Sequence, residues 1–141
     1  MIPKTGRAII LENNQIISIK RTKYNDDGSI KRIYYTFPGG HVEGNESYEE
    51  AAIREVYEEL GLKVEIRKEF MYIHNEELNR DEKFFQVNIK GGKLGTGNGP
   101  EFKNVDYKKY GKYEIVKINI KALQEYNLLP MEVKNRIIDE L

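Results

Sequence analysis

The chain has 141 residues, of which 39% are hydrophobic and 33% charged, and this composition fits one globular domain, residues 1–141, that buries a core. Lys plus Arg and Asp plus Glu both number 23, so the net charge is zero and broad electrostatic capture of nucleic acid or a membrane surface is not favoured. The absence of cysteine excludes disulfides, thiolate nucleophiles and zinc–thiolate sites. No apolar segment in residues 1–21 is long enough for a signal peptide or a membrane helix, so we expect a cytoplasmic protein.

Two short β-branched runs open the chain, at residues 7–11 and 15–20. The turn-forming step Glu12-Asn13-Asn14 lies between them. Two such runs joined by a short polar turn are typical of a β-hairpin, so we predict that these strands pair with each other.

A third strand is predicted at residues 30–37, after the polar loop 24–29. Basic side chains stand on both sides of this loop, at Arg21, Lys23, Lys31 and Arg32. They either meet phosphate groups or serve only as solubilising surface charge. The sequence leaves both interpretations open.

The best-marked element is a helix that begins after Ser47. Ser47 followed three residues later by Glu50 is a capping box, and Gly61 is the expected C-terminal stop. Apolar residues recur every four positions inside this helix, at Ala52, Val56 and Leu60. They predict a stripe that packs on a core.

A second stripe on the same helix is acidic. Glu55, Glu58 and Glu59 stand at i, i+3 and i+4, so their carboxylates converge on one side, about a third of a turn from the apolar stripe. Like charges at this spacing repel each other, and a cation between them would remove that cost. Hard oxygen ligands on a rigid element suit Mg²⁺ or Mn²⁺, which take their remaining ligands from waters and phosphates. The alternative is a solvated acidic surface with no ligand.

After the helix, residues 63–73 and 83–89 predict two strands, the second of them largely buried. Residues 91–100 follow, with five glycines in ten positions. Long irregular loops of this kind often bind ligands or cover sites.

The rest of the chain predicts a strand at 113–118 and helical segments at 120–126 and 131–141. Pro130 fits the start of the last helix. Val133, Ile137 and Leu141 fall four apart and predict its packing stripe.

Residues 39–62 read GGHVEGNESYEEAAIREVYEELGL and resemble the Nudix box, the signature of the Nudix hydrolase family. All nine defining positions match: Gly40, Glu46, Arg54, Glu55, Val56, Glu58, Glu59, Gly61 and Leu62. The match runs from Gly40 to Leu62 and covers 23 of the 141 residues. Its one departure is Asn45 before Glu46, where many relatives have glycine, and Asn also tolerates left-handed backbone angles.

The resemblance implies an α+β fold in which a mixed β-sheet is sandwiched between helices. It also implies a metal site for Mg²⁺ or Mn²⁺. In that site Glu58 and Glu59 are the principal ligands, together with the backbone carbonyl of Gly39. Glu55 is either a further ligand or the general base that deprotonates the attacking water.

Relatives commonly supply another acidic residue from a loop after the box. Glu101, which follows the glycine-rich segment, is our candidate for this metal-binding and catalytic role, with Asp106 in reserve; the alternative is an ordinary surface acid. Four residues of the box are expected to be structural: Gly40, Glu46, Arg54 and Gly61. Arg54 and Glu46 are expected to form an ion pair between helix and loop.

The implied reaction is divalent-metal-dependent hydrolysis of a phosphoric anhydride bond in a nucleoside diphosphate linked to another moiety, and the compact length favours nucleoside triphosphates, oxidised ones included. The alternatives are a pyrophosphatase acting on ADP-ribose or another nucleotide sugar, an enzyme on capped RNA ends, and a non-catalytic nucleotide-binding Nudix module. The retention of every box acid argues against the last, and the zero net charge argues against RNA.

Arg21, Arg32 and Phe37 are the candidate substrate-binding residues. Other aromatic residues near predicted strands are Tyr34, Tyr35, Tyr72, Phe84 and Phe85, most of which we expect to pack in the core. The expected partner is a small-molecule nucleotide, with no nucleic acid and no membrane. The sequence is compatible with a monomer or a homodimer.

Overall fold

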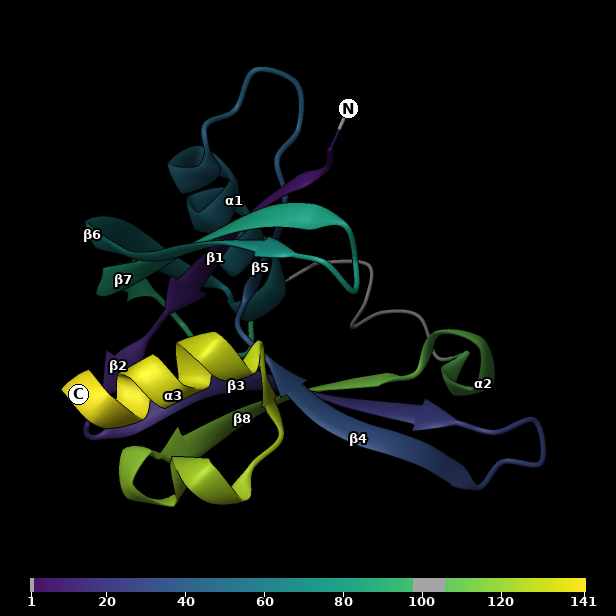
Figure 1. Ribbon diagram of the computed structural model, residues 1–141. Coiled ribbons are helices and arrows are strands. Elements are labelled where there is room, and N and C mark those ends of the chain that lie inside the picture. The colour runs from purple at the N-terminus through teal and green to yellow at the C-terminus, as the bar shows by residue number, and fades with distance from the viewer. Residues whose placement is uncertain (1, 98–105) are drawn as a thin grey trace. The chain divides into compact units, whose positions relative to one another are not determined.

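The computed structural model describes residues 2–97 and 106–141 (Figure 1). The chain forms two compact units, residues 1–11 with 38–98 and residues 12–37 with 99–141. Within the described ranges, no helix is both long enough and apolar enough to cross a membrane.

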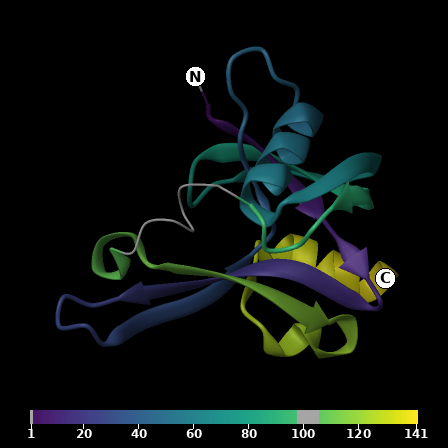
Figure 2. The ribbon, with the colours of Figure 1, turned by 180° about the vertical axis from the view of Figure 1, so that it is seen from behind.

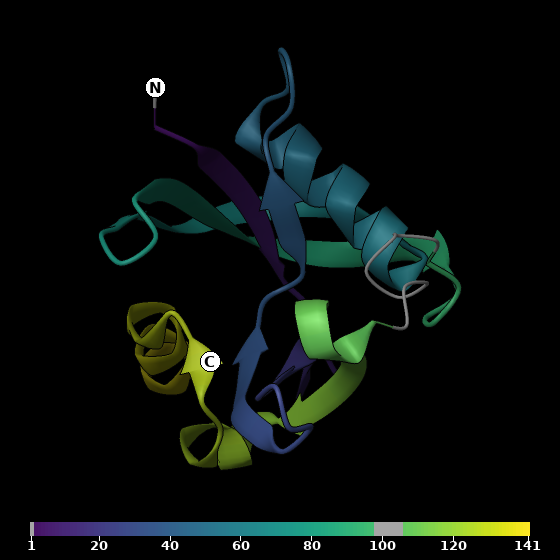
Figure 3. The ribbon, with the colours of Figure 1, turned by 90° about the vertical axis from the view of Figure 1, so that its right-hand side faces the viewer.

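The first unit is a four-stranded sheet with one helix packed on it. Its elements are β1 (Lys4–Ile9), β5 (Gly39–His41), α1 (Tyr48–Leu60), β6 (Leu62–Asn75) and β7 (Arg80–Gly92). The strand order is β5-β1-β7-β6, with β1 parallel to β7 and the other pairs antiparallel. Helix α1 packs against β1, β5 and β6, as the views in Figures 2 and 3 show.

Helix α1 approaches β1 closely because Gly6 has no side chain. A Cβ at Gly6 would lie 2.0 Å from the carbonyl oxygen of Tyr48. Because side chains alternate along a strand, Gly6 and Ala8 face the helix, while Thr5 and Arg7 face away from it. The sheet therefore has a face covered by α1 and an opposite face that carries polar residues.

The second unit is built on another mixed sheet. Its elements are β3 (Gln15–Tyr24), β4 (Ile30–Thr36), α2 (Tyr107–Tyr110), β8 (Lys112–Asn119), the 3-10 helix η2 (Ile120–Glu125), β9 (Leu128–Leu129) and α3 (Met131–Glu140). The order runs β2-β3-β4-β9, where β2 is Leu11–Glu12, and β8 also pairs with β3. Buried side chains of its last three segments include Leu123, Leu128, Val133 and Ile137.

The predicted N-terminal hairpin is only partly present. Asn13 and Asn14 both have positive φ, 53° and 63°, so they form the predicted tight turn. The strand that turns into β3 is the two-residue β2, however, whereas β1 pairs with β5 and β7. The prediction that residues 7–11 pair with residues 15–20 is therefore wrong, because a β-branched run does not specify its partner.

The other predicted elements are confirmed within a few residues, with the predicted strands 30–37, 63–73, 83–89 and 113–118 matching β4, β6, β7 and β8. The segment 120–126 is a 3-10 helix, and α3 begins after Pro130. Val133 and Ile137 are fully buried, but Leu141 lies beyond the end of α3 and is 45% exposed, so it does not belong to the packing stripe. Two mixed sheets with helices confirm the α+β class, with the strands divided between two sheets instead of one.

Candidate active site

Helix α1 presents the two stripes that its sequence predicts. The Ser47 side chain accepts from the Glu50 N–H, and the Glu50 carboxylate accepts from the Ser47 N–H. Gly61 takes left-handed angles at the C-cap. The capping box and the helix bounds are thus confirmed, and the apolar stripe of Ala52, Val56 and Leu60 is fully buried.

The acidic stripe runs from solvent into the protein. The side chain of Glu58 is 38% exposed, that of Glu55 is 17% exposed, and Glu59 is 9% exposed. Three carboxylates of one helix therefore meet three different environments.

The two glycines of β5 lie against these carboxylates. The Gly39 N–H donates to Oε1 of Glu59 at 2.7 Å. A Cβ on Gly40 would lie 2.6 Å from Cδ of Glu55, and a Cβ on Gly39 would lie 2.3 Å from the Gly6 carbonyl oxygen. Gly39 also has a φ of 142°, which favours glycine. The missing side chains thus let Gly39 approach β1 and let Gly40 approach Glu55.

Arg54 connects this stripe to the loop. Its Nε and Nη2 donate to the two carboxylate oxygens of Glu46 at 2.7 and 3.0 Å, a bidentate pair. Its Nη1 donates to Glu55 at 2.9 Å and to Glu58 at 3.2 Å, and its Nη2 also donates to the carbonyl oxygen of His41 at 3.0 Å. Glu55 and Glu58 therefore each direct one oxygen toward the same cationic atom, Nη1 of Arg54.

The charges around Arg54 are unequal. The hydrogen bond with Glu46, followed by interactions with Glu55, raises the pKa of Arg54, and the same hydrogen bond lowers the pKa of Glu46. Glu43 also lies 3.8 Å from Nη2, so four carboxylates share one guanidinium. A cluster with this surplus of negative charge attracts cations.

A second charged cluster is buried in the same unit, on the sheet face away from α1. Oε1 of Glu82 accepts from Thr5 Oγ1 at 2.9 Å, from Arg7 Nε at 3.2 Å and from Arg80 Nε at 3.0 Å. Its Oε2 accepts from Asn75 at 3.1 Å, and its side chain is 1% exposed. Burial alone would raise the pKa of Glu82, but the two guanidiniums, with the Asn75 and Thr5 hydrogen bonds, hold it below the ordinary value.

The same cluster affects the pKa of His41. Burial lowers its pKa first, and the charges of Arg80 and Arg7 lower it further, while Glu82 acts in the opposite direction. The end of β5 therefore lies in the field of this cluster.

In the second unit, basic and aromatic side chains gather on β3, β4 and β8. The guanidinium of Arg21 lies 3.6 Å from the Tyr113 ring centroid, and that of Arg32 lies 4.5 Å from the Tyr34 ring centroid. Stacking on aromatic rings holds both guanidiniums on the surface of this sheet.

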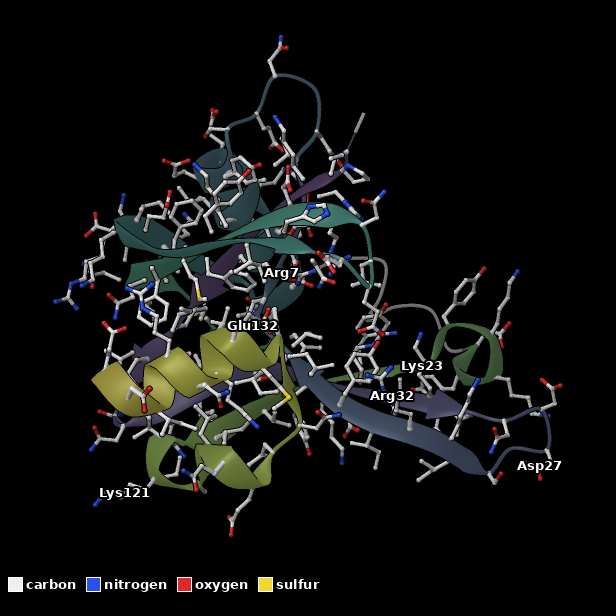
Figure 4. All side chains as sticks on the ribbon, viewed as in Figure 1. Arg7, Lys23, Asp27, Arg32, Lys121 and Glu132 are labelled. Carbon is white, nitrogen blue, oxygen red and sulfur yellow. The ribbon has the colours of Figure 1, made fainter. Side chains whose placement is uncertain are left out.

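Lys23 neighbours both arginines, because it follows Arg21 by two residues on β3 and lies opposite Arg32 on β4. Lys23 and Arg32 are register partners on β3 and β4, and both are labelled in Figure 4. Burial, then the charges of Arg21 and Arg32, lower the pKa of Lys23. Nε of Arg21 is buried and has no hydrogen-bond partner among the described residues. Crowded cations and an unused donor favour an anionic ligand here.

Comparison with known proteins decides the family. The NUDIX domain matches residues 3–123 of this chain. The chain belongs to the Nudix family. Membership confirms the predicted family and the predicted enzyme class, a Nudix-type pyrophosphohydrolase.

Solved structures agree with the Nudix fold. A MutT structure, described for Aliivibrio salmonicida and Vibrio cholerae, is 23% identical with a TM-score of 0.68 and full coverage of both chains. The solution structure of the Escherichia coli ORF135 protein is 21% identical with a TM-score of 0.64, covering 98% of this chain and 86% of that one. An ADP-ribose pyrophosphatase from Streptococcus suis is 16% identical with a TM-score of 0.67, covering 99% and 91%.

Nudix hydrolases generally need divalent metal ions, and the donors along α1 fit such an ion. Glu55 and Glu58 place oxygens within 2.9 and 3.2 Å of one cationic nitrogen, and one or two carboxylates suffice for Mg²⁺ when water and phosphate complete the shell. In residues 2–97 and 106–141, no three acidic or histidine side chains stand together in a metal-ligating group. Glu59 is instead engaged by the Gly39 N–H.

The remaining predicted site residues of this Nudix chain lie in different environments. Phe37 has no exposed surface, and its role as a substrate-binding residue stays a prediction. Glu101 lies outside the described residues. Asp106 is the N-cap of α2, where its carboxylate accepts from the Lys109 N–H at 3.3 Å.

Sequence reasoning missed the Glu82 cluster. Glu82 stands one residue before the predicted strand 83–89, and its partners come from β1, from the end of β6 and from the start of its own strand. The one available signal was a charged residue next to a run of buried aromatics, Phe84 and Phe85.

Proposed function

We propose that this Nudix protein hydrolyses a phosphoric anhydride bond in a nucleoside diphosphate linked to another group, with nucleoside triphosphates, oxidised ones included, as the preferred substrates. One observation carries the proposal: Glu55 and Glu58 each direct an oxygen toward Nη1 of Arg54, beside the two glycines of β5. A polyphosphate carries dense negative charge, so its hydrolysis needs cations and a placed water.

The proposed metal is Mg²⁺ or Mn²⁺, held by Glu58, Glu59 and the carbonyl oxygen of Gly39. When bound, it screens the phosphate oxygens and lowers the pKa of a bound water. Glu58 is the most accessible carboxylate of the stripe and is suited to the first contact with the ion. Glu59 also fixes the N–H of Gly39 through its hydrogen bond.

Glu55 is proposed as a further ligand or as the base that takes the proton of the attacking water. Its carboxylate is sheltered by Gly40 and held by Arg54, so its position is defined before substrate arrives. Glu101 is the second candidate for this role. Arg54 and Glu46 are proposed to act structurally, since their bidentate pair joins α1 to the loop.

Substrate phosphates are proposed to meet Arg21 and Arg32. Both guanidiniums stack on tyrosine rings, and Arg21 retains a buried donor, Nε, without a hydrogen-bond partner in the described part of the chain. We also propose that residues 1–141 act as one domain, since the family match at 3–123 includes parts of both units.

A nucleotide panel tests the function. Nucleoside triphosphates, their oxidised forms, ADP-ribose and nucleotide sugars are incubated with Mg²⁺ or Mn²⁺, and the released mononucleotide, pyrophosphate and phosphate are quantified. Cleavage of triphosphates to mononucleotide and pyrophosphate supports the proposal. Exclusive cleavage of ADP-ribose or nucleotide sugars would replace the substrate class, and no cleavage of any anhydride would refute the enzyme.

Glu58→Gln, purified identically, is the control for contaminating hydrolases. Hydrolysis in ¹⁸O-labelled water identifies the bond that breaks, because the label is found on the phosphorus atom that water attacks. Activity that persists unchanged in the variant would belong to a contaminant or to another site.

A further inference from the structure

Both backbone polar groups of Gly39 have side-chain partners, one on each face of the first unit's sheet. Its N–H donates to Glu59, on the α1 side, at 2.7 Å. Its carbonyl oxygen lies 3.5 Å from Nη1 of Arg7, whose side chain is on the opposite face. Arg7 and Gly39 are register partners across β1 and β5, and a Cβ on Gly39 would lie 2.8 Å from Cγ of Arg7. Gly39 therefore packs directly against the side chain of Arg7.

Arg7 is itself fixed by the buried carboxylate of Glu82. Its Nε donates to Oε1 of Glu82, which also accepts from Arg80 and Thr5. Figure 4 labels Arg7 among the strands of this unit. Because a guanidinium is planar, a hydrogen bond at Nε to a fixed carboxylate also sets the direction of its outer nitrogens. The direction that results is toward the Gly39 carbonyl oxygen.

A buried charge cluster is costly for the fold alone. Well-packed apolar residues of similar volume are often as stabilising as a buried ion pair, or more so. The charges in this cluster therefore call for a use beyond packing, and the contact between Arg7 and Gly39 offers one.

We propose that Arg7, fixed by Glu82, is a positioning residue that orients the Gly39 carbonyl oxygen toward a divalent cation. The inference rests on the proposed function, which makes this oxygen a ligand beside Glu58 and Glu59. A carbonyl oxygen has two lone pairs, so it accepts from Arg7 with one and serves a cation with the other. Glu82 offsets the positive charge of Arg7, which would otherwise repel the cation.

Direct Mn²⁺ binding to the metal-free protein tests the proposal. Arg7→Met is the primary variant, because Glu82 keeps its hydrogen bonds from Arg80, Thr5 and Asn75. Free Mn²⁺ is measured by electron paramagnetic resonance during a titration. We expect binding to weaken about tenfold, as is typical when a group that orients a metal ligand is lost. Arg67→Met, on the exposed surface of β6, is the matched control and should bind as the wild type does.

The outcomes separate this inference from the proposed function. If folded Arg7→Met binds Mn²⁺ as tightly as the wild type, or more tightly, the inference is overturned and the proposed function stands. If the wild type binds no Mn²⁺, the proposed function itself fails. Should Arg7→Met not fold, Arg7→Lys replaces it; one ammonium cannot reproduce the separate Nε and Nη1 contacts, so wild-type affinity there would also overturn the inference.

A second readout needs no metal. Amide hydrogen exchange of Gly39, followed by NMR in the metal-free protein, should accelerate about tenfold in Arg7→Met, because loss of the contact at the Gly39 carbonyl oxygen frees the residue to open locally and expose its N–H. The Gly61 amide, which caps α1 by donating to Tyr57, should be unaffected. Unchanged exchange at Gly39 would overturn the positioning role.

The part played by Glu82 is tested by a double-mutant cycle. Glu82→Gln, measured below its unfolding temperature, should weaken Mn²⁺ binding in the wild-type background and have no further effect in Arg7→Met. Additive effects would overturn the claim that Glu82 acts through Arg7.

Discussion

The two charged clusters of the first unit use the same kinds of side chain in opposite ratios. Around α1, four carboxylates share the guanidinium of Arg54, two from the helix and two from the loop before it. On the far face of the sheet, Arg7 and Arg80 share the carboxylate of Glu82. The first cluster has surplus negative charge, whereas the second encloses its acid among donors.

The two clusters also differ in how far their acidic side chains are exposed to solvent. The Glu58 side chain is 38% exposed and the Glu82 side chain is 1% exposed. An open cluster with surplus charge of one sign is suited to a ligand of the other sign. A closed cluster whose partners are supplied by the chain is suited to fixing geometry. The comparison assigns the reaction to the first cluster, and stability together with the orientation of the Gly39 carbonyl oxygen to the second.

Removing one acid from the open cluster should give the largest effect. Glu58→Gln keeps the size of the side chain but removes its charge, so kcat should fall roughly 10²- to 10³-fold, the cost of losing one group that stabilises the transition state. Because Glu58 is partly exposed, the free energy of unfolding should stay within about 0.5 kcal/mol of the wild type. Initial rates with Mg²⁺ and urea unfolding measure the two quantities.

The matched control is Glu49→Gln, an exposed acid in the first turn of the same helix. It should retain the wild-type rate. A near-normal rate in Glu58→Gln would remove that residue from the site and erase the contrast between the clusters.

The closed cluster should respond in the reverse manner. Glu82→Gln removes the carboxylate that Arg7 and Arg80 share, and breaking a buried ion pair from one side costs about 3–5 kcal/mol. Urea unfolding should show this loss at an unchanged m-value. Glu65→Gln, an exposed acid on β6, should change stability by less than about 0.5 kcal/mol. A loss that small for Glu82→Gln would mean that the cluster does not stabilise the fold.

Alanine substitutions at two neighbouring glycines sharpen the comparison, because the Cβ added at each would meet a different kind of atom. A Cβ on Gly40 would meet the flexible end of Glu55, which can move aside. Gly40→Ala should therefore spare the fold but displace Glu55, and a displacement near 1 Å costs about 10²-fold in rate.

Gly39→Ala provides the contrast. Its Cβ would meet backbone, the Gly6 carbonyl oxygen at 2.3 Å, at a φ of 142°. Strain of that kind costs about 1–3 kcal/mol, so this variant should lose stability as well as activity in the same two assays. Equal stability for the two variants would contradict the steric argument.

These contrasts also explain how much the sequence could predict. Helix α1 was predictable at both ends because Ser47, Glu50 and Gly61 act on backbone groups within four residues. The Asn13-Asn14 turn is equally local. The acidic stripe follows from helical spacing alone, and the convergence of Glu55 and Glu58 on one atom of Arg54 agrees with that spacing, whereas Glu59 accepts from the Gly39 N–H.

What the sequence could not predict depends on contacts between distant segments. Arg7 and Glu82 are 75 residues apart, and no spacing rule connects them. The partner of β1 is likewise set by parallel pairing with β7, which a strand pattern does not encode. The burial of Phe37 and Glu59 is a further result of tertiary packing.

Acid should distinguish the clusters by a smaller effect. The pKa of Glu82 is lower in the folded protein than its ordinary value of 4.5, so its contribution to stability is complete above that pH and is lost as the pH falls through the folded value. The stability difference between the wild type and Glu82→Gln should therefore be constant near neutral pH and shrink below 4.5. Urea unfolding at a series of pH values measures it, and a constant difference down to the lowest pH would contradict the assignment.

The smallest effect should come from the cap of α1, which supports the open cluster without belonging to it. Ser47→Ala removes the side-chain acceptor of the Glu50 N–H and should cost about 1 kcal/mol of unfolding free energy. Ser47→Asp restores an acceptor and should recover most of that loss. The rate at 25 °C should not change in either variant, because Ala52, Val56 and Leu60 keep the helix on the sheet. A fall in kcat that tracks the lost stability would mean that the acidic stripe depends on the cap, and that chemistry and stability are not as separate in α1 as its two faces indicate.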